Sequence, residues 1–165
     1  MKRILIAVVS LAVSAVIFTQ EGGASSGGIL PVHFFTSGVC PACKQAGREL
    51  PAMLGRYPRL RLRTYEVRDA MNRVNDLHRR NMALLVRLLQ DIKTRTKGGR
   101  FIYEGRTPHA FVAVRGVPYY EKKISATTTV KKEIPVPVFV MGDRVYIGYR
   151  QEIISRALAE YHGGR

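Results

Sequence analysis

Hydrophobic and polar positions alternate in two ways along the chain, and each predicts one kind of element. Short apolar runs rich in β-branched and aromatic residues predict buried strands, whereas apolar positions three or four residues apart predict amphipathic helices. The predicted elements are a strand at Ile29–Thr36, a helix from Cys40 to about Tyr57, a strand at Arg59–Val67, a helix at Val74–Lys93, strands at Val136–Met141 and Arg144–Ile147, and a helix at Arg150–Tyr161.

The pattern also predicts where some of these elements lie. Leu60 and Leu62 alternate with arginines, which is typical of a half-solvated strand at a sheet edge, where charges discourage pairing with other chains. The long helix places Val74, Leu77 and several later leucines at helical spacing, so we expect it to pack on the sheet. Gly142-Asp143 is a favourable two-residue turn, which makes the two strands around it a hairpin.

Residues 94–133 are less regular. Phe101–Tyr103 and Ala110–Val114 have the composition of strands, and Gly105–Pro108 is expected to turn between them. The polar run Lys122–Lys132 is predicted to be a surface loop. Taken with the long helix before it, this segment leads us to expect a helical insertion ahead of the C-terminal hairpin.

The N-terminus has the pattern of a targeting segment. A basic start, the apolar run Ile4–Phe18 and small residues after it are typical of a secretory signal peptide, here residues 1–24. The run is shorter than the ~20 residues of a usual spanning helix, although an uncleaved membrane anchor is the alternative. Residues 25–28 form a Gly/Ser tether, and 29–165 form one domain. We therefore expect export to the periplasm or another extracytoplasmic compartment.

Composition and charge narrow the function classes. The chain has 165 residues, of which 46% are hydrophobic and 24% charged, which excludes a fully disordered protein. Its 27 Lys and Arg outnumber 12 Asp and Glu, giving a formal charge of +15. The basic residues are dispersed and lack aromatic platforms, so we expect no nucleic acid partner. Salt-sensitive attraction to an anionic membrane surface fits the charge better.

The two cysteines carry the candidate chemistry. Cys40-Pro41-Ala42-Cys43 follows a predicted strand and opens a helix, and this context makes the C-x-x-C spacing specific. Unpaired N–H groups and the positive helix end stabilise a thiolate at Cys40, so we predict that Cys40 attacks. Cys43 lies one turn further in and is predicted to resolve the mixed disulfide. Lys44 and Arg48 add positive potential, which favours an oxidant or isomerase over a reductant.

At this point the chain resembles the thioredoxin-like superfamily, particularly its glutaredoxin-like and DsbA-like members. The matching stretches are Val32–Phe35 leading into Cys40–Cys43, Val136–Val140 with Gly142-Asp143, Gly148-Tyr149 and the last helix. The resemblance implies an α/β thioredoxin-like fold, with a central mixed sheet flanked by helices. It also implies a thiol–disulfide oxidoreductase that acts on protein thiols and disulfides with a redox partner protein. No cofactor is implied beyond the redox-active Cys40–Cys43 disulfide, and no metal.

The same resemblance implies a substrate-binding proline. Family members have a cis-proline before the hairpin strand and beside the cysteines, and Pro137 occupies that position. The backbone of Val136 is then expected to pair with an extended substrate chain. Pro108, which also precedes an apolar run, is the rival position, and a simple edge-strand proline is the alternative reading of Pro137.

Two positions depart from the family pattern. Thioredoxins and DsbA-like proteins usually carry a buried carboxylate six residues before the first cysteine, where this chain has Phe34. The usual tryptophan before that cysteine is replaced by Val39. Glutaredoxin-like members lack the carboxylate, so the expected fold is unaffected. The group that takes the proton of the buried cysteine stays unassigned.

Two other functions compete with redox exchange. A metal site would need ligands besides the thiols, and the histidines are scattered without metal-like spacing at positions 33, 78, 109 and 162. A copper-handling domain is the better metal alternative, because thioredoxin-like scaffolds have been adapted to that use. A non-catalytic domain that binds a partner protein is the other.

Overall fold

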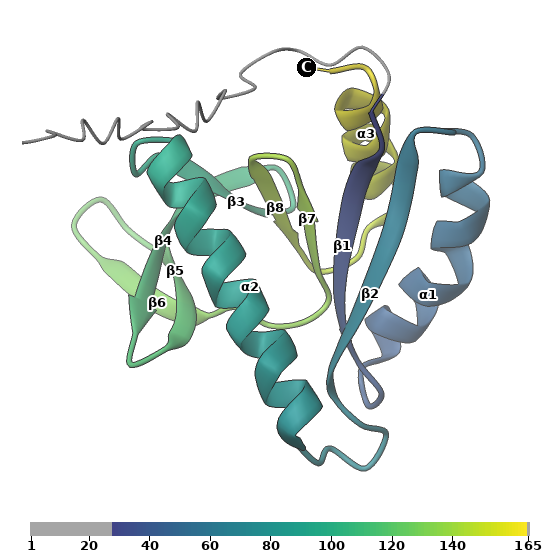
Figure 1. The fold of residues 1–165 in the computed structure, drawn as a ribbon. Helices are drawn as coiled ribbons and strands as arrows, with labels where there is room; N and C mark the ends of the chain where they lie inside the picture. The colour runs from purple at the N-terminus through teal and green to yellow at the C-terminus, as the bar shows by residue number, and fades with distance from the viewer. Residues whose placement is uncertain (1–27, 165) are drawn as a thin grey trace, which may run out of the picture.

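The chain folds into an α/β domain in which three helices cover a mixed sheet of eight strands (Figure 1). The computed structural model describes residues 28–164. The elements in chain order are β1 (Leu30–Ser37), α1 (Pro41–Leu54), β2 (Leu60–Arg68), α2 (Asp76–Arg95), β3 (Arg100–Glu104), β4 (Thr107–Val114), β5 (Val117–Lys123), β6 (Thr129–Glu133), β7 (Val138–Met141), β8 (Arg144–Ile147) and α3 (Gln151–His162).

The strand order and directions place the C-terminal ends of four strands at the same end of the sheet. The order is β2-β1-β7-β8-β3-β4-β5-β6. β1 runs parallel to β2, and β8 runs parallel to β3, whereas β7 is antiparallel to both β1 and β8. β1, β2, β8 and β3 therefore point the same way, and the segments that follow them meet at that end.

The helices divide between the two faces of the sheet, and each face has its own core. α2 packs on one face through Leu85, Leu89 and Ile92. α1 and α3 pack on the other, where Leu50 and Leu158 are fully buried. Successive residues of a strand point to opposite faces, so Phe34 contributes to the α1/α3 core and Phe35 to the α2 core. Because β1 is buried on both faces, the segment leading to the cysteines is rigidly held.

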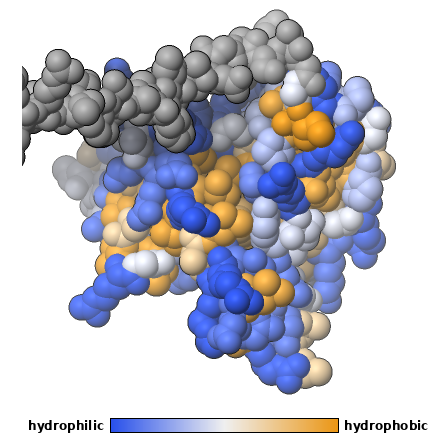
Figure 2. Space-filling model, viewed as in Figure 1, coloured by the Kyte–Doolittle hydropathy of each residue, from blue (hydrophilic) through white to orange (hydrophobic). Residues whose placement is uncertain are grey.

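The face of the molecule seen in Figure 2 is largely hydrophilic. Apolar residues show between the hydrophilic ones in patches. Several large apolar side chains are exposed. They are Ile29, Val39, Met71, Val74, Leu77, Val114 and Ile124.

Most of the predicted elements are present at about the predicted bounds. The mixed sheet flanked by helices is confirmed, as are the edge position of β2 and the β7–β8 hairpin. The inward face of α2 was predicted wrongly at its start. The helix begins at Asp76, so Val74 lies before it, and Leu77 is 53% exposed in its first turn. Core packing starts only further along α2, with its later leucines.

The expected helical insertion is wrong. Between α2 and β7 the chain forms four strands, which extend the sheet beyond β8 and include no helix among residues 100–133. The predicted loop Lys122–Lys132 contains the end of β5 and most of β6. The strands predicted at Phe101–Tyr103 and Ala110–Val114 are present as β3 and β4. β6 was missed because it is an exposed edge strand held by its ladder with β5.

The N-terminal predictions mostly fall outside the described part of the chain. The signal peptide or anchor at 1–24 and all but the last residue of the 25–28 tether precede residue 28. Within residues 28–164, every helix is too short or too polar to cross a membrane.

Candidate functional site

Cys40 lies at the junction between β1 and α1. β1 ends at Ser37, and a tight turn follows, closed by the Cys40 amide donating to the Ser37 carbonyl over 3.1 Å. α1 starts at Pro41, whose missing N–H costs nothing in the first turn. Cys40 is therefore the residue that caps the helix, and a strand buried on both faces fixes its position.

The two thiols have different surroundings. The Cys43 backbone N–H donates to Cys40 Sγ over 3.1 Å, so the Cys40 side chain acts as the N-cap of α1. The bond satisfies one of the backbone N–H groups that lack a partner at the start of a helix. Cys40 is partly exposed, whereas Cys43 is 2% exposed. An incoming group can therefore reach Cys40, while Cys43 is shielded beneath it.

Burial keeps Cys43 protonated. Burial raises the pKa of the Cys43 thiol to about 11, and its contact with Cys40 adds to the increase. The Ser37 backbone and the Thr36 side chain hydrogen-bond to the thiol and oppose the increase only in part. Cys43 must therefore lose a firmly held proton before it can attack.

The segment before β7 lies against Cys40, although it is almost 100 residues away in the sequence. The Cys40 thiol donates to the Val136 carbonyl over a sulfur–oxygen distance of 3.7 Å. The bond between Val136 and Pro137 is cis, where the resemblance places a cis-proline, and it is the only cis bond in residues 28–164. Pro108, the rival position, lies in β4 with a trans bond. The structure thus brings Cys40, Cys43, Val136 and Pro137 together.

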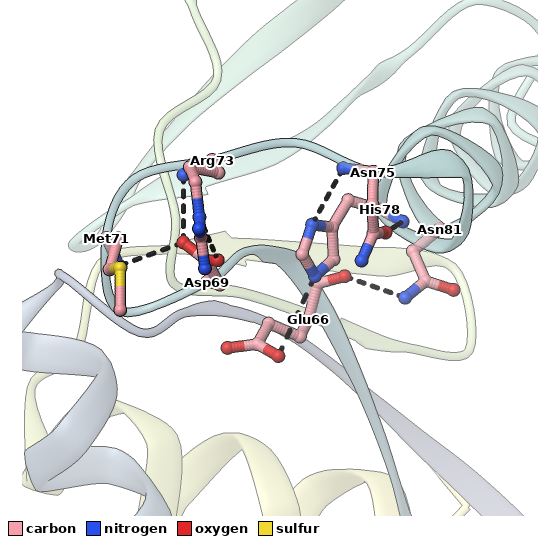
Figure 3. A network of polar contacts seen from close by, with 7 residues as sticks. All are labelled: Glu66, Asp69, Met71, Arg73, Asn75, His78 and Asn81. Carbon is pink, nitrogen blue, oxygen red and sulfur yellow. Dashed lines mark hydrogen bonds and ion pairs between the residues drawn. The ribbon is translucent and has the colours of Figure 1, made fainter.

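The loop between β2 and α2 forms another wall of the site. The Gly38 amide donates to the Arg68 carbonyl over 3.0 Å. A Cβ at position 38 would lie 2.5 Å from the Ala70 backbone nitrogen, so only glycine allows this close approach. Asp69 stabilises the loop by accepting from the backbone amides of Met71 and Arg73 at 2.8 and 2.9 Å (Figure 3). Met71 is left 72% exposed near the turn that carries the cysteines.

His78 holds the far end of this loop, which the sequence did not indicate. Its backbone amide donates to the Asn75 side chain over 2.9 Å, and the Asn75 amide donates back to His78 Nδ1 over 3.2 Å (Figure 3). This reciprocal cap starts α2. His78 Nε2 faces the Glu66 carboxylate at 3.7 Å. The S/T/D/N-x-x-E/Q signature of such caps does not include histidine, which explains why this one was missed.

Phe34, at the position where the resemblance implies a buried carboxylate, is part of the core. Phe34 is 2% exposed, and its ring stacks on Phe139 at a centroid distance of 5.0 Å. The polar groups near Cys43 are instead those of Thr36 and Ser37. The Ser37 hydroxyl is buried and has no hydrogen-bond partner within residues 28–164. The Thr36 hydroxyl, rather than a carboxylate, therefore lies close to the buried thiol.

The four histidines do not gather around the cysteines. His33 contacts Tyr65 on β2, His78 caps α2, His109 lies on β4, and His162 ends α3. In the part of the chain that the structure describes, no three His, Cys, Asp or Glu side chains are placed to hold a metal ion. The thiol pair is left without nearby metal-ligating partners there.

Comparison of the chain with protein-family models, curated proteins and solved structures gives no match.

Proposed function

We propose that this protein is an exported thiol–disulfide oxidoreductase of thioredoxin-like fold, with Cys40 as nucleophile and Cys43 as resolving thiol. The arrangement of the pair carries the proposal. Cys40 is a partly exposed residue whose Sγ accepts the Cys43 N–H at a helix start, while Cys43 is buried. The β1-α1-β2 unit and the β7–β8 hairpin with its final helix support the thioredoxin-like part of the proposal.

The reaction consists of two exchanges. The Cys40 thiolate attacks one sulfur of a client disulfide, forming a Cys40–client disulfide and releasing the other client sulfur as a thiolate. Cys43, once deprotonated, attacks Cys40 Sγ, which forms the Cys40–Cys43 disulfide and releases the second client thiolate. The client gains two electrons, and the protein loses them. The same steps in reverse oxidise a client dithiol, and a dithiol or disulfide partner protein restores the starting form.

Val136 is suited to hold the client chain. Its carbonyl lies 3.7 Å from Cys40 Sγ, so a client backbone paired with this segment would place its own sulfur near the nucleophile. Pairing in the strand-adding manner uses main-chain hydrogen bonds, which are independent of client sequence. We therefore assign Val136 and Pro137 to substrate binding.

Trapping tests the function. In the full-length chain, Cys43→Ser removes the resolving thiol, so clients should remain attached through Cys40 as mixed disulfides that reducing agent releases. Non-reducing electrophoresis followed by mass spectrometry would detect and name them. The matched control is the Cys40→Ser, Cys43→Ser double variant, which should trap nothing.

The same trapping experiment shows which of the two cysteines is the nucleophile. If Cys40→Ser alone captures as many partners as Cys43→Ser, the roles assigned to the two cysteines are wrong. If neither single variant captures a thiol-linked partner, a non-catalytic binding domain becomes the better proposal.

The raised pKa of Cys43 predicts how resolution depends on pH. With a pKa of about 11, Cys43 is almost fully protonated at neutral pH, and its thiolate fraction rises about tenfold per pH unit. The resolving step should therefore accelerate by about tenfold per pH unit between about pH 7 and 9. The main cause of the raised pKa is the burial of Cys43, and Cys43 remains covered when Cys40 is in a mixed disulfide.

Stopped-flow mixing with an aryl disulfide measures this step, because the second aryl thiol is released only on resolution. Cys43→Ser is the control and should release a single equivalent. A resolving rate that does not change over this pH range would contradict the assigned state of Cys43.

A further inference from the structure

A charged groove begins beside the cis-proline segment. Pro135 and Gly148 line a hollow of about 270 Å³, together with Tyr103, Tyr149 and Arg150. Pro135 is joined directly to Val136, whose carbonyl contacts Cys40 Sγ. Gly148 donates its amide to the Pro137 carbonyl over 2.9 Å. The hollow therefore borders the segment that we assign to client binding.

This hollow continues into a second one between α3 and the β3–β4 turn. The second has a volume of about 540 Å³ and shares Glu104, Gly105 and Arg150 with the first. Arg106 and Lys122 also line it. We call the two hollows together the α3 groove. It runs from the cis-proline segment to the inserted strands.

The charges along the α3 groove are not balanced within the domain. Lys122 Nζ lies 2.7 Å from the Glu104 carboxylate, which also accepts from the Tyr120 hydroxyl over 3.2 Å. That carboxylate is therefore neutralised locally. Arg106 and Arg150 are exposed and form none of the ion pairs found within residues 28–164. Glu152 is the one carboxylate left to face them.

A neighbouring hollow extends the same pattern. It has a volume of about 250 Å³ and adds Arg156 and the pair formed by Arg144 and Glu160, whose atoms are 2.5 Å apart. Arg156 forms no ion pair in the described part of the chain. Three arginines thus stand against one unpaired carboxylate over a floor of tyrosine rings, with Tyr103 and Tyr146 stacked at 5.3 Å.

We infer that the α3 groove binds an acidic stretch of the client polypeptide next to its reacting cysteine. This inference rests on the proposed oxidoreductase function and adds a specificity to it. A client chain paired with Val136 passes directly into the groove. Carboxylates on that chain meet guanidinium groups that lack partners, whereas lysines at the same positions are repelled.

Three disulfide peptides that differ only in their flanks test the inference on the full-length chain. The flanks are glutamates, serines or lysines, and the measurement is the rate constant of exchange. At about 0.01 M salt, where the Debye length is about 30 Å, the glutamate peptide should react about tenfold faster than the lysine peptide. At about 1 M salt the difference should largely disappear, because the Debye length falls to about 3 Å.

Two charge-matched variants separate the groove from the field of the whole protein. Arg106→Glu with Arg150→Glu lowers the net charge by four, from +15 to +11. Arg80→Glu with Arg87→Glu makes the same change on α2, where both arginines are exposed. The first should abolish or reverse the preference for glutamate, and the second should keep it within about twofold. Thermal unfolding of both variants checks that each is folded.

Two results would overturn the inference. Equal rates for the three peptides would reject the groove while leaving the proposed function intact. An equal loss of preference in both variants would assign the preference to net charge alone. No exchange with any peptide would instead contradict the proposed function, on which the groove's role depends.

Discussion

Replacing Cys40 by serine is expected to reduce the rate of disulfide exchange by about a thousandfold or more. A serine hydroxyl stays protonated in neutral solution and cannot form the sulfur–sulfur bond that begins the reaction. The fold should be retained, because serine is among the best N-cap residues and its oxygen can accept the Cys43 N–H. We expect the free energy of unfolding to change by no more than about 0.5 kcal/mol.

The measurement is the exchange rate with a protein disulfide, together with chemical denaturation of the same samples. Cys43→Ser is the matched variant, because it also replaces one sulfur by oxygen. It should keep the first attack and lose turnover. Exchange by Cys40→Ser within about tenfold of the unmodified protein would show that Cys40 is not the nucleophile.

Leu89→Ala is expected to destabilise the domain by about 2–5 kcal/mol, whereas Leu77→Ala should change its stability by no more than about 0.5 kcal/mol. Both substitutions lie in α2 and change helix propensity equally. Leu89 is fully buried in the core that α2 shares with the sheet, while Leu77 is 53% exposed. The difference between the two variants therefore reports packing alone.

Urea denaturation at neutral pH measures both free energies. An equal cost for the two variants would mean that the start of α2 packs as closely as its middle, as helical spacing alone predicted. A cost below about 1 kcal/mol for Leu89→Ala would place the core of this face elsewhere.

The contrast between Leu77 and Leu89 shows where sequence patterns predicted the fold and where they did not. The helical spacing of apolar residues identified α2. It could not show that only the later turns of this helix pack on the sheet. β1 and the β7–β8 hairpin were predictable because their apolar runs are buried. β6 was not, because its side chains are mostly exposed and its only constraint is the ladder with β5. The pattern of apolar and polar residues predicts a strand only where one of its faces is buried, and an edge strand such as β6 buries few side chains.

The site was predictable in part. The C-x-x-C spacing after a strand placed Cys40 at a helix start and Cys43 beneath it, which are local relations. The contact between Cys40 and Val136 joins residues 96 positions apart, so only a resemblance could suggest it. The approach of Gly38 to Ala70 and the cap formed by His78 depend on how the β2–α2 loop folds back. No motif of the sequence encodes these contacts.

β3–β6, the strands between α2 and β7, determine which part of the chain can be removed. β3 pairs with β8 through Ile102, Tyr103 and Glu104. Phe101, Phe111, Tyr120 and Ile134 complete the core under α2. A shortened chain without β3–β6 would leave β8 with an unprotected row of backbone donors and acceptors and would expose the apolar underside of α2. Such an edge is a template for self-association. β3–β6 therefore cover the edge of β8 and the apolar face of α2. We expect the whole span from β1 to α3 to be needed for folding.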